Sequence, residues 1–110
     1  MMSMYNFKVN KTPLEALEYL KRGMDEELVY EKVHDVAGNM RSIIVIYEKY
    51  FMRNSSRASL VVTINNFNKV TEIETISSGS SQGMIFNFDW GAGDEFAHSV
   101  KHLFEDSIID

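Results

Sequence analysis

Residues 40–66 read MRSIIVIYEKYFMRNSSRASLVVTINN and hold two β-strand patterns joined by a polar loop. In 40–52, apolar residues lie on both faces of an extended chain, which predicts a central strand covered on both sides for part of its length. In 58–66, apolar and polar residues alternate, as in a strand with one buried face. The loop at 53–57 is rich in Ser, Asn and Arg. The stretch therefore predicts two adjacent strands of a sheet.

The strand pattern extends in both directions. Residues 27–36 are rich in Val and Tyr and end at an Ala-Gly-Asn turn signal, which predicts a hairpin with the strand at 40–52. Residues 5–9 alternate as an earlier strand. The apolar residues of 69–77 do not keep a strict period of two, which predicts a strand with a bulge. Residues 84–90 alternate again and predict a last strand.

A helix is predicted between the first two strands. Thr12 and Glu15 have the spacing of a capping box, and Pro13 stands at the first helical position. Gly23 follows two basic residues and suits the end of the helix. We therefore expect a helix at 13–22.

A second helix is predicted after Gly91 and Gly93, which break the last strand. Asp94 and Glu95 place negative charge at the positive end of the helix dipole. The apolar residues that follow recur at helical spacing: Phe96, Ala97, Val100, Leu103, Phe104 and Ile108. The stretch SSGSSQG at 77–83 is too short to separate domains and predicts a mobile loop between strands.

This order of elements predicts an α+β fold in a single domain over residues 1–110. We expect a single antiparallel sheet of five to six strands, with a short N-terminal helix and a C-terminal helix on one face (β-α-β4/5-α). The order resembles that of the TATA-binding-protein-like and helix-grip folds, which implies a curved sheet around the C-terminal helix. The segment 82–95, QGMIFNFDWGAGDE, resembles small bacterial families of unknown function. That resemblance implies no particular activity.

Composition excludes several functions. The chain has a net charge of −5, and the acidic excess lies in its C-terminal half, which argues against nucleic-acid binding as the main role. The absence of Cys excludes disulfides, zinc–cysteine sites and thiol catalysis. No apolar run approaches the ~20 residues of a membrane helix, and no signal peptide is evident. We therefore expect a soluble, cytoplasmic protein with no membrane association.

Two histidines offer the clearest metal-binding pattern. His98 and His102 are spaced i, i+4 on the predicted C-terminal helix, with Asp94 and Asp106 on a similar face. A metalloprotease would need Glu directly after the first His, where this chain has Ser99. The alternative is two solvated histidines on an amphipathic helix. We assign no metal ligands and no cofactor.

Nucleophilic and phosphate-binding patterns are incomplete. Ser81 stands in a literal Gly-x-Ser-x-Gly string, but a nucleophile elbow belongs in a strand-to-helix turn of a larger sheet. The glycines at 91 and 93 precede a helix without the Lys of a P-loop. We therefore assign no catalytic residue.

The aromatic residues are the candidate ligand-binding set. They are predicted on different strands, where inward rings could line a pocket for an apolar molecule: Trp90, Phe88, Phe86, Tyr47 and Tyr30. The alternative, favoured by the short chain, is that the rings fill the core.

These observations predict a non-catalytic binding or interaction module. Its partner would be an apolar small molecule, another protein or a second copy of the chain, with exposed faces of the strand at 40–52 packed across a twofold axis. The alternative is a small enzyme or metal-binding protein that uses the carboxylates and histidines of 89–102.

Overall fold

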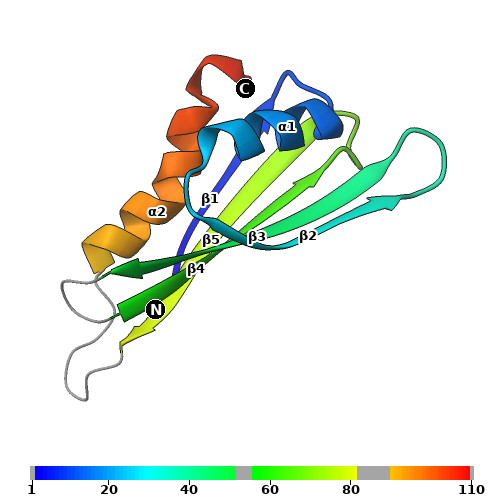
Figure 1. Ribbon diagram of the computed structural model, residues 1–110. Helices are drawn as coiled ribbons and strands as arrows, with labels where there is room; N and C mark the ends of the chain where they lie inside the picture. The colour runs from blue at the N-terminus through cyan, green and yellow to red at the C-terminus, as the bar shows by residue number, and fades with distance from the viewer. Residues whose placement is uncertain (1, 52–55, 82–89, 110) are drawn as a thin grey trace.

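The computed structural model of the protein describes residues 2–51, 56–81 and 90–109 (Figure 1). Over these ranges the elements follow in the order β1 (Met2–Val9), α1 (Pro13–Gly23), β2 (Glu27–Asp35), β3 (Arg41–Phe51), β4 (Ser56–Asn65), β5 (Thr71–Ser81), α2 (Trp90–Leu103), the 3-10 helix η2 (Glu105–Ser107) and β6 (Ile108–Ile109).

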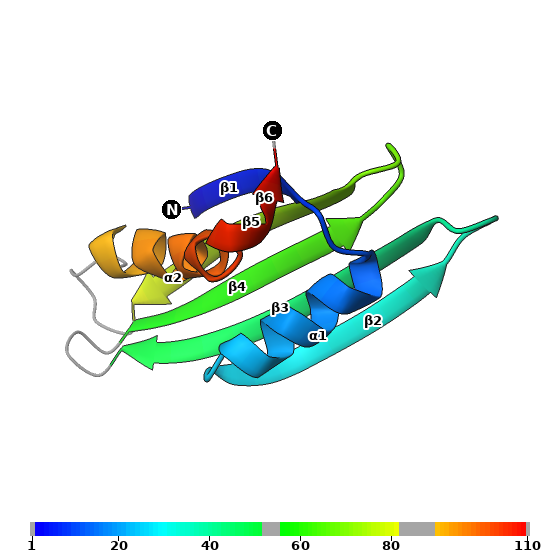
Figure 2. The same ribbon diagram turned by 90° about the horizontal axis from the view of Figure 1, so that it is seen from above.

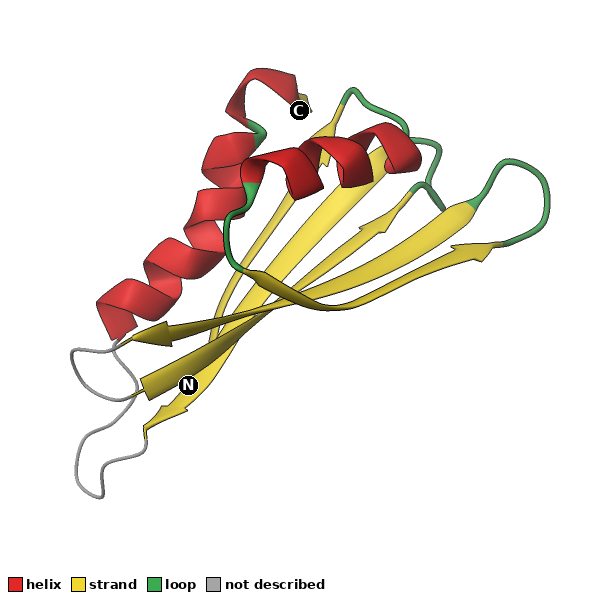
Figure 3. Cartoon of the chain, viewed as in Figure 1, coloured by secondary structure: helices red, strands yellow, loops and turns green. Residues whose placement is uncertain are grey.

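The strands form a single sheet (Figure 3). The sheet is antiparallel, with the strands in the order β2-β3-β4-β5-β1-β6. Strands β2 to β5 are a meander in which each strand pairs with the next. The N-terminal strand β1 pairs with β5 on one side and with the short β6 on the other. The predicted α+β fold with a single antiparallel sheet is confirmed.

Helix α1 begins where its capping box predicts. The Thr12 hydroxyl accepts a hydrogen bond from the Glu15 N–H at 3.2 Å, and the Glu15 carboxylate accepts one from the Thr12 N–H at 2.9 Å. At the other end, the N–H of Met24 donates to the Leu20 carbonyl at 3.0 Å. Reciprocal capping satisfies two backbone donors that would otherwise lack partners.

Both helices pack on the same face of the sheet, which we call the inner face (Figure 2). Helix α1 lies on β3 and β4, and α2 lies on β1 and β5. The helices meet where Gly23 faces Leu103, because a Cβ on Gly23 would lie 2.4 Å from a Leu103 methyl carbon. The buried apolar residues form one core: Phe7, Val9, Ala16, Leu17, Leu20, Ile43, Val45, Tyr47, Ala58, Leu60, Val62, Ile64, Ile73, Phe96, Ala97, Val100 and Phe104.

Two predictions at the end of β5 and the start of α2 differ from the structure. Strand β5 runs through Ser81, although 77–83 was predicted as a loop, because β4 pairs along β5 up to Ser81 and β1 pairs with it up to Ser78. Trp90 begins α2 instead of ending a strand, since packing of the helix on the sheet outweighs the weak helix propensity of the glycines that follow. The rest of the predicted strand at 84–90 lies outside the described residues.

The bulge predicted for residues 69–77 lies in β2 and not in β5. Strand β5 keeps a regular register with both of its neighbours, and the register shift occurs in β2 between Leu28 and Tyr30. Strand β3 lies inside the sheet as predicted, and its inner face is buried. On its outer face Ile44 and Ile46 are half-buried, and no described helix covers them.

Candidate functional site

The face of the sheet opposite the helices is the open face. Side chains that pair directly across two strands point to the same face, so the registers assign each residue of the sheet to one face. The buried inner residues alternate with outer residues along β3, β4 and β5. In the described part of the chain, both helices contribute to the core beneath the inner face and leave the open face uncovered.

One row of apolar side chains crosses the open face at right angles to the strands. Direct pairing joins its members from β2 to β1, in the order Tyr30, Ile46, Val61, Ile76 and Met4. The three central side chains are half-buried, whereas Tyr30 is 46% exposed and Met4 is 57% exposed. We call this set the apolar row.

Mostly polar side chains border the apolar row on both sides. The row on one side consists of Lys32, Ile44, Thr63, Glu74 and Asn6. The row on the other side contains Glu27, Glu48, Ser59 and Ser78. A continuous apolar strip with a charged and polar border has the composition of a protein-binding surface.

The bulge in β2 completes the apolar row. Leu28 pairs with Tyr47 of the inner face, whereas Tyr30 pairs with Ile46 of the open face. Without the register shift at Val29, Leu28 and Tyr30 would point to the same face, because side chains two residues apart share a face in a regular strand. The bulge therefore turns Tyr30 outward onto the open face.

The two tyrosines of the predicted ligand set lie on opposite faces of the sheet. Tyr47 belongs to the core and is 2% exposed. Burial raises the pKa of the Tyr47 hydroxyl above its usual range, and the nearby carboxylates of Glu31 and Glu26 raise the pKa further. Tyr30 lies in the apolar row, so the chain does not bring Tyr30 and Tyr47 into one pocket.

The other three aromatic candidates are not described in the same detail. Phe86 and Phe88 lie outside the described residues. Trp90 is the first residue of α2, and its side chain lies outside the described part. An apolar ligand pocket that includes these three rings stays a prediction.

The histidines of α2 interact with separate partners. The His98 ring packs against the Tyr5 ring at 5.2 Å, and the Tyr5 hydroxyl donates to Asp94 at 2.8 Å. The hydrogen bond to Asp94 raises the pKa of Tyr5, with smaller contributions from desolvation and from the charge of Asp94. His102 pairs with Glu105 at 3.0 Å. Among the described residues, no three His, Asp or Glu side chains are grouped to hold a metal ion.

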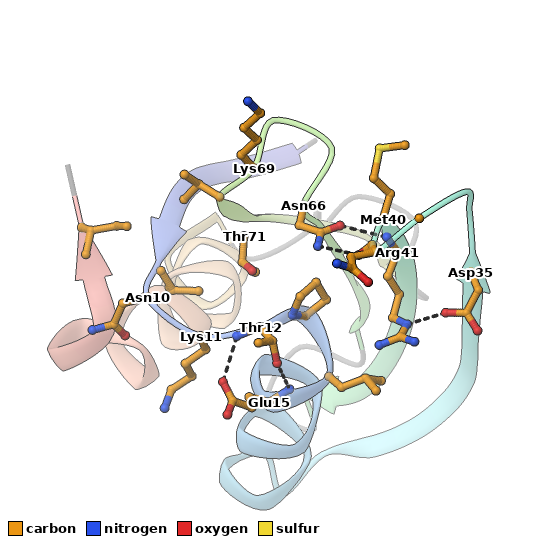
Figure 4. A pocket seen from close by; sticks show the side chains of 17 residues that line it. Asn10, Lys11, Thr12, Glu15, Asp35, Met40, Arg41, Asn66, Lys69 and Thr71 are labelled. Carbon is orange, nitrogen blue, oxygen red and sulfur yellow. Dashed lines mark hydrogen bonds and ion pairs between the residues drawn. The ribbon is translucent and has the colours of Figure 1, made fainter.

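A hollow of about 910 Å³ lies at the end of the sheet where α1 begins (Figure 4). Many of its polar groups hold neighbouring turns together. Asn66 accepts from the Arg41 N–H at 2.8 Å and donates to the Asn39 carbonyl at 3.0 Å. The Arg41 guanidinium is paired with Asp35. These interactions give Asn66 and Arg41 a structural role at the edge of this hollow.

The fold and its surfaces define a class: a small α+β fold with one antiparallel sheet, in which both described helices cover one face and leave the other without a described cover. The chain belongs to a family of unknown function (DUF6054), which matches residues 2–108. This confirms the expected membership of a small uncharacterised family. Comparisons with curated proteins and with solved structures found no match.

The resemblance to TATA-binding-protein-like and helix-grip folds, the bacterial origin and the cytoplasmic location stay predictions. Among the described residues, no helix is both long enough and apolar enough to cross a membrane.

Proposed function

We propose that this protein is a non-catalytic interaction module that binds a protein partner through the open face of its sheet. The observation that carries the proposal is the apolar row. Isolated apolar residues are common on protein surfaces, whereas a contiguous apolar strip marks an interaction site. Removing apolar surface from water contributes about 25 cal/mol per Å², so covering this row favours association.

The flat face is a better candidate than the edge of the sheet. Strand β2 is an edge strand, and all nine of its residues are exposed. An inward-facing charge and a bulge both discourage the addition of a further strand. Strand β2 has both, because Glu31 pairs with Val45 of the inner face and the register shifts at Val29. Glu31 also forms an ion pair with Lys21 of α1 at 2.8 Å.

Site-specific photo-crosslinking tests the proposal. A benzophenone amino acid replaces Thr63, which lies beside Val61 on the open face, or Glu18, which is exposed on α1. After irradiation in cells, we expect protein adducts from position 63 and none from position 18. Adding Val61→Asp should abolish the adducts, because a charge in the row opposes burial.

Either of two results would contradict the interaction module. One is the absence of any protein adduct at position 63, including an adduct with a second copy. The other is an equal yield of adducts at positions 63 and 18, which would show that crosslinking is not specific to the open face.

A further inference from the structure

We infer that the partner is a second copy of this chain, related to the first by a twofold axis that runs along the apolar row. This inference rests on the proposed function. In this arrangement the two open faces pack against each other. The helices of both copies lie outermost, which gives four layers.

The apolar row is self-complementary about such an axis. A twofold interface uses the same patch on both subunits, so the patch has to fit itself. With the axis along the row, each side chain meets its own counterpart, and apolar surface meets apolar surface on all five strands. Contact of this kind would cover Tyr30 and Met4, the two most exposed members of the row.

One pair of opposite charges beside the row also fits this axis. The rotation reverses the strand direction, so the row on one side of the axis faces the row on the other side. Lys32 then opposes Glu27 of the second copy, and this pair occurs twice in the dimer. Within the described residues, neither Lys32 nor Glu27 forms an ion pair in its own chain. Opposite charges across an interface favour one arrangement over others.

A twofold axis along β4 fits less well. That axis would exchange β2 with β1 and β3 with β5 while each β4 faced its counterpart. Arg57 would then oppose Arg57 of the second copy. Like charges across an interface are unfavourable, and the axis along the row avoids this contact.

The size of the open face is of the same order as a dimer interface. Five strands spaced about 4.8 Å apart span roughly 20 Å, and eight residues per strand span about 25 Å. The projected area is on the order of 500 Å², and the accessible area of a surface with protruding side chains is larger. A standard interface buries about 800 Å² per partner.

Charge reversal tests the partner and the axis together. Sedimentation equilibrium would give the dimer dissociation constant of the wild type, of Lys32→Glu, of Glu27→Lys and of the double variant. We expect each single reversal to raise Kd about tenfold, because it places two like-charge pairs in the dimer. The double variant restores opposite charges and should return Kd to about the wild-type value.

Glu18→Lys is the matched control, since it changes a charge on α1 away from the open face. Its Kd should equal that of the wild type. Both β2 positions are exposed, so these substitutions leave the core untouched, and circular dichroism would check the fold.

Three outcomes overturn the inference. A wild-type chain that stays monomeric at about 100 µM rules out the second copy as partner. Single reversals that leave Kd unchanged, or a double variant that is not restored, rule out the axis along the row. If photo-crosslinking at position 63 captures only a different protein, and Val61→Asp abolishes the adduct, the interaction module stands and the second copy fails. The two proposals therefore fail separately.

Discussion

The two faces of this sheet are made by the same strands and differ in how apolar residues are distributed. On the inner face, buried apolar side chains follow the strands lengthwise, as in β4, where every second residue from Ala58 to Ile64 is buried. On the open face, most apolar side chains form one row across the strands. Apolar side chains that follow the strands provide a long surface on which the helices pack. A single row across the strands provides only a narrow apolar strip within a polar surface.

The largest expected difference between the faces comes from neighbouring valines of β4. Val62 is fully buried on the inner face, and Val61 is half-buried in the apolar row. We expect Val62→Ala to lower the free energy of unfolding by about 2 kcal/mol, and Val61→Ala to lower it by less than about 0.5 kcal/mol. Urea unfolding at low protein concentration would measure both values. Equal losses would show that the open face is covered within the chain itself.

A smaller effect is expected under α2. The Ser77 hydroxyl is buried and has no hydrogen-bond partner among the described residues, whereas the Thr75 hydroxyl donates to the Ala97 carbonyl at 3.1 Å. Ser77→Ala removes an unsatisfied group and should raise the free energy of unfolding by up to about 1 kcal/mol. Thr75→Val removes a hydrogen bond and should lower it by about 1 kcal/mol. A loss of stability in Ser77→Ala would mean that the hydroxyl has a partner.

The smallest effect concerns alkaline pH. Because folding raises the pKa of Tyr47, its neutral form stabilises the native state below the unfolded pKa of about 10. This contribution is lost as the pH rises through the folded pKa. We expect the melting temperature to fall between about pH 9 and 11, and to fall less in Tyr47→Phe. The same slope in both proteins would exclude Tyr47 as the source.

Much of the fold follows from local sequence. The capping box at Thr12 predicts the start of α1, and alternation of apolar residues predicts the strands of the meander. Local sequence patterns did not predict the parts of the fold that depend on pairing between strands. The serines at the end of β5 have weak strand propensity, yet β4 pairs with them through Ser81.

Less of the candidate site could be predicted from the sequence. The sequence pointed to Tyr30 but missed Met4, Ile46, Val61 and Ile76 as a set, because long-range register and the bulge in β2 bring them together. Two residues gave a sequence signal for the apolar row. Val61 interrupts the outward polar positions of β4, and Ile76 breaks the spacing in β5. Apolar residues at outward positions of neighbouring strands indicate such a row once the register is known.

The pairing of β1 with β5 also sets an order of events during synthesis. Met2 pairs with Ser78 and Val9 pairs with Thr71, so β1 leaves the ribosome long before its partner strand exists. The meander from β2 to β5 needs only contacts between neighbouring strands and can form as it emerges. Until β5 is complete, the side chains of Phe7 and Val9 have no sheet to join. The nascent chain therefore carries β1 as an unpaired strand until β5 has emerged, and during this interval a chaperone that binds exposed apolar segments would protect it best.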